Sequence, residues 1–187
     1  MPTNPSEEFP RSDPAVTPDS PEQSAPARKG MLVVYHGDGD GKEAATLGVL
    51  FRAHGRGLPV RHMKFATPSE PPSGDDLALE RLGISSHHMA QEGPEGAKGL
   101  WQKGVRHISI VQEGVLVLDG LADAVREGWL STEEATTVLE QNDSLLHIIV
   151  TGRTAPSELI EIADLVSNMR AIKQRDASSP AIVGIDY

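Results

Sequence analysis

Short apolar runs alternate along the chain with longer segments in which apolar residues recur every three or four positions. The first run, at 31–35 (MLVVY), is rich in β-branched residues and is typical of a strand buried on both faces. Residues 43–54 carry apolar side chains at helical spacing, and Gly55 and Gly57 follow them. The same patterns predict further strands at 60–65, 115–118, 145–150 and 181–185, and further helices at 76–82, 95–111, 121–127, 131–141 and 157–171.

Two serines are candidate helix caps. Ser131 is followed three residues later by Glu134, which is the spacing of a capping box, and Ser157 stands where the last helix is predicted to begin. The polar stretch at 84–93 has neither periodicity and is predicted to be irregular. Strands that alternate with helices favour a P-loop NTPase-like, three-layer α/β/α domain with a mostly parallel sheet.

The first 29 residues have a different composition. They contain almost no large apolar side chains and seven prolines, so they cannot bury enough surface to offset the entropy lost on ordering. We therefore expect a disordered tail at 1–29, with Phe9 as its one candidate anchor, and a folded domain at 30–187.

Charge and composition exclude several classes of protein. A formal net charge of −10 disfavours a broad electrostatic grip on nucleic acid or on an anionic membrane. The chain has no cysteine, which rules out disulfides and thiolate metal sites. No apolar run approaches the roughly 20 residues of a membrane helix, and the start lacks the pattern of a secretory signal. We expect a cytoplasmic protein.

A glycine-rich loop at 37–42 separates the first strand from the first helix. Open α/β sheets bind ligands at such a position, and Gly37, Gly39 and Gly41 would let backbone N–H groups turn towards a phosphate. Lys42 directly follows the last glycine and could reach phosphate oxygens. The loop is therefore a candidate nucleotide site.

Three other interpretations of this loop compete. A dinucleotide fingerprint is rejected, because the third glycine falls one residue early and no acidic residue ends the second strand. A calcium loop is rejected, because Lys42 and Glu43 stand where it needs an oxygen ligand and a glycine. A purely structural glycine turn stays open from the loop alone.

The loop also departs from the general phosphate-loop pattern. His36 replaces the first glycine, and Glu43 replaces the hydroxyl residue that binds Mg²⁺. Asp38 and Asp40 add negative charge, and each such neighbour within about 4 Å could oppose phosphate binding by ~1 kcal/mol or more. A magnesium ion would reverse this effect, since carboxylates are good Mg²⁺ ligands.

Several segments together resemble one family over residues 30–187. They are HGDGDGKEAA at 36–45, RAHG at 52–55, VLVLD at 115–119, VTGR at 150–153, ADLVS at 163–167 and GIDY at 184–187. In this order they resemble the P-loop corrinoid adenosyltransferases of cobalamin biosynthesis. That family transfers the 5′-deoxyadenosyl group of ATP to the cobalt of a reduced corrinoid such as cob(I)alamin or cob(I)yrinic acid a,c-diamide.

The resemblance implies ATP, Mg²⁺ and a corrinoid as ligands, and a homodimer is expected from it alone. Asp119 would help to position magnesium, and Phe65 and Lys173 would lie on the corrinoid side. The implied nucleotide-binding residues are Gly37, Gly39, Gly41, Lys42, Glu43 and Arg153. Two of these roles have simpler alternatives: Asp119 could be only a helix N-cap, and Arg153 only a surface residue.

The departures from the family pattern cluster on the nucleotide side. Asp40 replaces a lysine, Glu43 and Ala44 replace two threonines, and Gly120 replaces a glutamate. Two hypotheses follow: an adenosyltransferase that tolerates an altered loop, or a catalytically silent relative that binds a corrinoid for storage, delivery or sensing. The overall match favours the first at the level of the family, and the clustered changes favour the second.

The pair His87-His88 raises the question of a metal site. No third ligand at a sensible spacing accompanies these residues, so we interpret them as exposed loop histidines.

Overall fold

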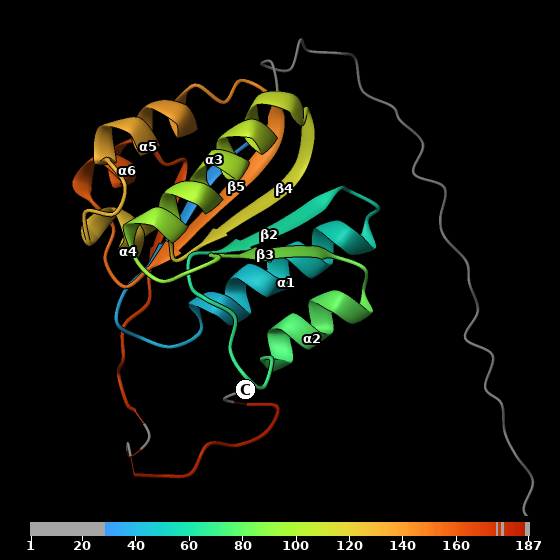
Figure 1. Ribbon diagram of the computed structural model, residues 1–187, viewed down its shortest axis with the longest axis vertical. Coiled ribbons are helices and arrows are strands. Elements are labelled where there is room, and N and C mark those ends of the chain that lie inside the picture. Colours follow the sequence, from blue (N-terminus) through green and yellow to red (C-terminus); the bar gives the residue numbers. More distant parts are fainter. Residues whose placement is uncertain (1–28, 175, 177, 186–187) are drawn as a thin grey trace, which may run out of the picture.

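A six-stranded, all-parallel sheet forms the centre of the protein (Figure 1). The computed structural model describes residues 29–174, 176 and 178–185. The strands are β1 (Leu32–His36), β2 (Val60–Lys64), β3 (Ser85–His88), β4 (Glu113–Asp119), β5 (Leu145–Gly152) and β6 (Leu165–Asn168), in the sheet order β3-β2-β4-β5-β1-β6.

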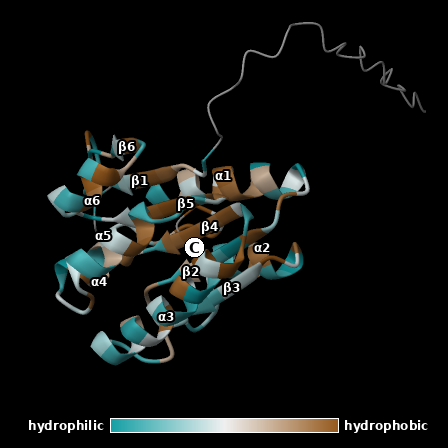
Figure 2. Cartoon of the chain, turned by 90° about the horizontal axis from the view of Figure 1, so that it is seen from above, coloured by the Kyte–Doolittle hydropathy of each residue, from teal (hydrophilic) through white to brown (hydrophobic). Residues whose placement is uncertain are grey.

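Helices cover both faces of this sheet. They are α1 (Lys42–Gly55), α2 (Gly74–Arg81), α3 (Pro94–Ile110), α4 (Leu121–Arg126), α5 (Thr132–Glu140) and α6 (Ser157–Ile162). One apolar core joins the sheet to α3, α4, α5 and α6, and a second core joins it to α1 and α2. Figure 2 shows the result as apolar central strands between helices with polar outer surfaces. The predicted three-layer α/β/α fold is confirmed.

The central strands have the burial that their sequence predicts. In β4 every residue from Gly114 to Asp119 is buried, and Val117 and Leu118, which point to opposite faces, are both fully buried. Because all strands are parallel, their carboxyl ends lie along one edge of the sheet. This edge carries the loop after β1, Asp119 at the end of β4 and the segment after β5.

The prediction for 84–93 was wrong, because Ser85–His88 forms strand β3. This strand pairs with β2 alone and lies at the edge of the sheet, where a polar sequence is tolerated. Its histidines are half-buried strand residues and not exposed loop residues as expected.

The predicted helix at 157–171 was also wrong beyond residue 162. Helix α6 ends there, and Leu165–Asn168 forms β6 beside β1. The Asp164 carboxylate accepts a hydrogen bond of 2.7 Å from the Leu32 amide, and pairing with the open edge of β1 outweighs helix propensity in this segment.

The two predicted serine caps have different outcomes. Ser131 is the N-cap of α5, and its hydroxyl accepts a hydrogen bond of 3.3 Å from the Glu134 amide, as predicted. Ser157 is not a cap: Pro156 occupies the N-cap position of α6, and the Ser157 hydroxyl donates to the neighbouring Glu158 carboxylate.

The predicted strand at 181–185 is absent, since its described residues form coil and turn on the surface. Ile185 is 78% exposed. The expected tail lies outside the described residues except for Lys29, as do the last two residues of the GIDY segment. None of the described helices is long and apolar enough to cross a membrane.

Candidate functional site

The glycine loop connects β1 to α1 and lies against the chain that follows β6. A Cβ atom on Gly37 would lie 2.1 Å from the carbonyl oxygen of Met169, and one on Gly39 would lie 2.7 Å from the carbonyl carbon of Arg170. Gly37 and Gly41 also have positive φ angles of 119° and 100°. Close approach and backbone conformation therefore both require glycine in this loop.

Lys42 folds back over the loop. Its side chain is buried, and its Nζ donates hydrogen bonds of 2.9 Å to the Gly37 carbonyl and 2.7 Å to the Gly39 carbonyl. Burial of an ammonium group is tolerated here because these acceptors compensate for lost water. The charge of Lys42 is thus held over the glycine loop.

Some backbone amides of the loop are already hydrogen-bonded, whereas those at the start of helix α1 are not bonded within the helix. The amide of Gly37 donates to the Arg153 carbonyl and that of Gly39 to the Met169 carbonyl, both at 2.9 Å. The amides of Lys42, Glu43 and Ala44 open the helix and have no intrahelical acceptor. The helix dipole adds favourable partial charge at the same place, so this turn is suited to an anion.

Arg153 joins this loop through its backbone. Its amide donates to both oxygens of the Asp123 carboxylate at 3.0 and 3.1 Å, and its carbonyl accepts from Gly37. Its side chain is exposed and makes no hydrogen bond within the described residues. The structure therefore places Arg153 beside the glycine loop with its guanidinium group in solvent.

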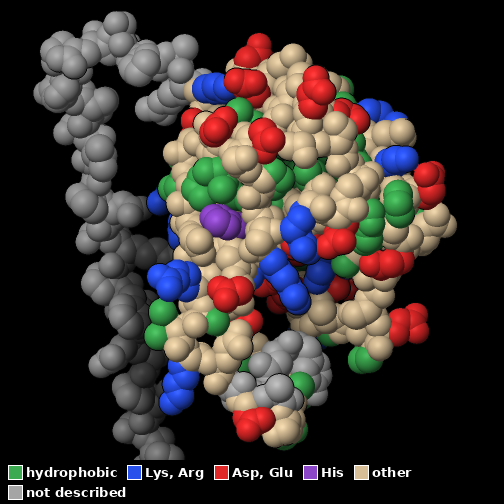
Figure 3. Space-filling model, turned by 90° about the vertical axis from the view of Figure 1, so that its left-hand side faces the viewer, with side chains coloured by type: hydrophobic (Ala, Val, Ile, Leu, Met, Phe, Trp, Pro, Cys, Tyr) green, Lys and Arg blue, Asp and Glu red, His purple; other side chains and the backbone are tan. Residues whose placement is uncertain are grey.

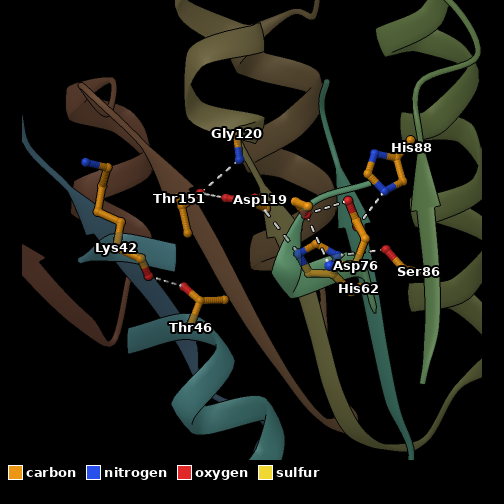
Figure 4. A network of polar contacts seen from close by, with 10 residues as sticks. Lys42, Thr46, His62, Asp76, Ser86, His88, Asp119, Gly120 and Thr151 are labelled. Carbon is orange, nitrogen blue, oxygen red and sulfur yellow. Dashed lines mark hydrogen bonds and ion pairs between the residues drawn. The ribbon is translucent and has the colours of Figure 1, made fainter. Parts of the chain in front are cut away.

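Asp119 ends β4 and is buried. The Thr151 hydroxyl donates a short hydrogen bond to Asp119 Oδ1 and itself accepts one of 2.8 Å from the Gly120 amide (Figure 4). Gly120 is the N-cap of α4 and no side chain caps that helix, so the explanation of Asp119 as an N-cap was wrong. Asp119 is held by Thr151 at the edge of the sheet.

His62 lies on the neighbouring strand β2 and faces Asp119. Its Nδ1 is 3.0 Å from the Ser86 hydroxyl and its Nε2 is 3.9 Å from Asp119 Oδ2 (Figure 4). Burial, together with the positive charge of Lys64, lowers the pKa of His62 to about 4. The imidazole is therefore neutral at pH 7.

A second histidine–carboxylate pair lies beside it. His88 Nε2 is 2.9 Å from Asp76 Oδ1, and the Ser73 hydroxyl donates to Asp76 Oδ2 at 2.7 Å. Burial raises the pKa of Asp76, but the Ser73 hydrogen bond and His88 outweigh it, so this pKa lies below its usual range. Asp76 is thus an anion near the end of the sheet.

A small polar pocket separates these groups from the start of α1, and its volume of about 10 Å³ is enough for one water-sized occupant. It is lined by Glu43, Thr46, Leu47, His62, Lys64, Asp75, Asp76 and Asp119. Four carboxylates surround it against one lysine, so the pocket favours a cation. The oxygen-rich lining fits Mg²⁺, and one of its carboxylates, Glu43, directly follows the phosphate loop.

The remaining predicted residues are more dispersed. Glu43 is exposed but lines the polar pocket, and Lys173 is exposed beyond β6. Phe65 is 7% exposed and packs in the core under α3. Lys and Arg side chains gather near the centre of the face seen in Figure 3, although the protein as a whole is acidic.

Sequence reasoning missed His62, Thr151 and Asp123. Thr151 lay within the VTGR segment but was assigned no role, and Asp123 was visible only as an acid in the first turn of a helix. His62 gave no signal, because its partners become neighbours only through the pairing of β2 with β3 and β4.

Comparisons with known proteins agree with this architecture. Residues 28–187 match the model of the family described as ATP:corrinoid adenosyltransferase BtuR/CobO/CobP. The chain is 29% identical over 180 residues to the corrinoid adenosyltransferase of Escherichia coli K12, an alignment that covers 90% of this chain and 91% of the relative. The corrinoid adenosyltransferase CobA of Salmonella typhimurium gives the same identity and coverage.

Two other likenesses are weaker. The corrinoid adenosyltransferase of Pseudomonas aeruginosa is 28% identical over 181 residues, covering 89% of each chain. Among solved structures, the cytoplasmic domain of EssC is 14% identical with a TM-score of 0.45, over 83% of this chain and 36% of that one, and it adds nothing to the assignment. The match of the family model across nearly the whole described domain is decisive, and the chain belongs to the ATP:corrinoid adenosyltransferase family.

Proposed function

We propose that this protein transfers the 5′-deoxyadenosyl group of ATP to the cobalt of a reduced corrinoid. The Co(I) centre supplies two electrons to C5′ of the ribose, the C5′–O bond breaks, and triphosphate leaves with its bonding pair. Because cobalt is the nucleophile, the protein has to hold the triphosphate, orient C5′ and exclude water. The observation that carries the proposal is the buried Lys42 held over a glycine loop in a chain of this family.

The chain has suitable groups for the triphosphate. Gly37, Gly39 and Gly41 let the backbone approach a phosphate, and the first amides of α1 are free of intrahelical acceptors. Lys42 would exchange its two carbonyl acceptors for phosphate oxygens over a short movement. Arg153 follows the same loop and has a guanidinium group in solvent that could bind a phosphate or the corrinoid.

The polar pocket would hold a cation bound to the triphosphate. One oxygen of Asp119 is occupied by Thr151, and the other faces the pocket, where Glu43 provides a carboxylate in place of the usual hydroxyl. Such a cation, when bound, neutralises phosphate charge. On the corrinoid side, we assign Lys173 to the contact surface and Phe65 to its support from the core.

One observation favours a second function. Glu43 and Ala44 remove both hydroxyl residues from the helix start, and Asp40 adds an acid to the loop. A silent relative that binds a corrinoid without using ATP would tolerate these changes.

Calorimetry of ATP binding, with and without Mg²⁺, separates the two functions. We expect Mg²⁺-dependent binding by the native chain and loss of most of it in Lys42→Ala, while the surface variant Lys103→Ala binds as the native chain does. The proposal is contradicted if the native chain does not bind ATP and Glu43→Thr restores binding. In that case the fold is intact, ATP use has been lost, and corrinoid binding is the remaining function.

A further inference from the structure

His62 is a buried base whose second nitrogen faces the polar pocket. The residue is 5% exposed, and its Nδ1 is hydrogen-bonded to the Ser86 hydroxyl. In the tautomer with its proton on Nδ1, the imidazole donates to the Ser86 hydroxyl and Nε2 presents a lone pair; in the other tautomer Ser86 donates to Nδ1 and the proton is on Nε2, on the side of Asp119. No described residue makes a hydrogen bond with Nε2, so this lone pair has no partner within that part of the chain.

A carboxylate oxygen lies on the pocket side of this nitrogen. Nε2 and Asp119 Oδ2 are 3.9 Å apart, which is too long for a hydrogen bond. In the Nδ1-protonated tautomer the Nε2 lone pair and the carboxylate oxygen repel each other, and a cation between them would remove this repulsion and select that tautomer. Bonds of about 2.1 Å from a metal to nitrogen and to oxygen span up to about 4.2 Å, so one metal ion could bind both atoms after a small movement of the two side chains towards each other.

The surroundings of this pair support a cation. Glu43, Asp75 and Asp76 also line the pocket, and Lys64 is its single formal positive charge. Thr151 and Ser86 fix the two candidate ligands from behind, as the outer partners of metal ligands do. The described residues contain no group of three or more ready-made ligands. A cation that brings its own phosphate and water ligands needs only one or two from the protein.

We propose that His62 Nε2 and Asp119 Oδ2 together bind the divalent cation of the nucleotide site, and that the imidazole makes this site prefer a first-row transition-metal ion to Mg²⁺. This inference rests on the proposed nucleotide site but goes beyond it, since it assigns a nitrogen ligand. Mg²⁺ prefers oxygen ligands, whereas imidazole suits transition metals. His62 thereby adds a nitrogen ligand to a site in which Glu43 stands at the position of the missing hydroxyl.

Electron paramagnetic resonance of Mn²⁺ tests this directly, on the full chain with and without ATP. We expect bound Mn²⁺ to show coupling to a directly coordinated ¹⁴N nucleus, and Mg²⁺ to compete poorly for the site. In His62→Gln, which keeps a polar side chain for Ser86, the nitrogen coupling should vanish and Mn²⁺ affinity should fall about tenfold or more. His87→Val, on β3 outside the pocket, should change neither.

The other possible results distinguish a failure of the His62 proposal from a failure of the proposed function. Mn²⁺ bound with ATP but without nitrogen coupling overturns the role of His62 and leaves the nucleotide site standing. Nitrogen-coupled Mn²⁺ in a protein that does not bind ATP supports the metal site and contradicts the proposed function. Absence of Mn²⁺ binding both with and without ATP overturns the metal proposal. An equal loss of Mn²⁺ affinity in His87→Val would also overturn it, because the effect would then be structural.

Discussion

Lys42 and Asp119 are buried charged residues at the same edge of the sheet, and each is held by partners that suit its charge. Two carbonyl oxygens accept from Lys42, and the Thr151 hydroxyl donates to Asp119. Groups of this kind are costly to bury without partners, so their presence indicates a polar function at this edge. His62 belongs with them, because it is equally buried but neutral.

The lowered pKa of His62 predicts that the free energy of unfolding depends on pH. In the unfolded chain its pKa is near 6.5, whereas the folded protein lowers it to about 4. Between these values the unfolded state binds more protons, so the free energy of unfolding falls as the pH falls from about 6.5 to about 4. The full loss from this group is about 3 kcal/mol. Urea titrations of the metal-free protein across this range measure it.

The matched variant His62→Val should remove most of this slope. The charged groups that shift the pKa of His62 are Lys64 and His88, which lower it, and Asp75 and Asp76, which raise it. Asp119 also faces the imidazole, at 3.9 Å, and all five groups stay in the variant. An unchanged slope in His62→Val would show that His62 titrates normally in the folded protein and would contradict this account.

At the residue scale, sequence identified positions that carry their own local signal. Lys42 follows a glycine and Asp119 ends an apolar run, so both could be singled out from the chain alone. His62 sits within an ordinary strand pattern, and nothing local distinguishes it from a core or surface histidine. Its position opposite Ser86 depends on strand register, which the sequence does not encode in any one segment.

At the scale of elements, the apolar strands and amphipathic helices were predictable because burial imposes a period on them. The two strands that the sequence did not predict, β3 and β6, are the edge strands of the sheet. Edge strands need less apolar surface, and β3 consists of two serines and two histidines. Leu165–Asn168 is apolar enough to continue a helix, and only pairing with β1 makes it a strand.

Ser73 and Ser157 both stand at the start of a helix, and comparing them gives a prediction for the stability of the protein. Ser73 is the N-cap of α2, accepting from the Asp76 amide at 3.1 Å and donating to its carboxylate. Ser73→Ala should therefore lower the free energy of unfolding by about 1 kcal/mol. Ser157 caps nothing in the structure, so Ser157→Ala should cost clearly less. Equal losses for the two variants in urea unfolding would contradict these cap assignments.

At the scale of the whole molecule, the family fold was predictable because its segments keep their order over the described domain. At the start of the described residues, Lys29 Nζ donates to the Glu140 carbonyl and the Gly30 amide donates to the Ser144 carbonyl at 2.7 Å. Which ATP-site chemistry survives was not predictable, because the loop keeps its glycines and lysine but has lost its hydroxyl residues.

Removal of residues 1–28 tests whether the chain consists of a disordered tail and an independently stable domain. Their seven prolines and scarcity of large apolar side chains leave little to bury, so the shortened chain should unfold within about 0.5 kcal/mol of the full one. A loss well above this value in matched urea titrations would show that the tail packs on the domain, contrary to our expectation.

The central claim is that the altered loop still supports transfer of the adenosyl group. Its most direct test is to mix the chain with ATP, a divalent cation and chemically reduced cob(I)alamin, and to follow formation of the light-sensitive cobalt–carbon product by absorbance. We predict that the native chain forms adenosylcobalamin and that Lys42→Ala, although folded, forms almost none. A native chain that binds the corrinoid but yields no product would contradict the claim and identify the protein as a silent corrinoid-binding relative.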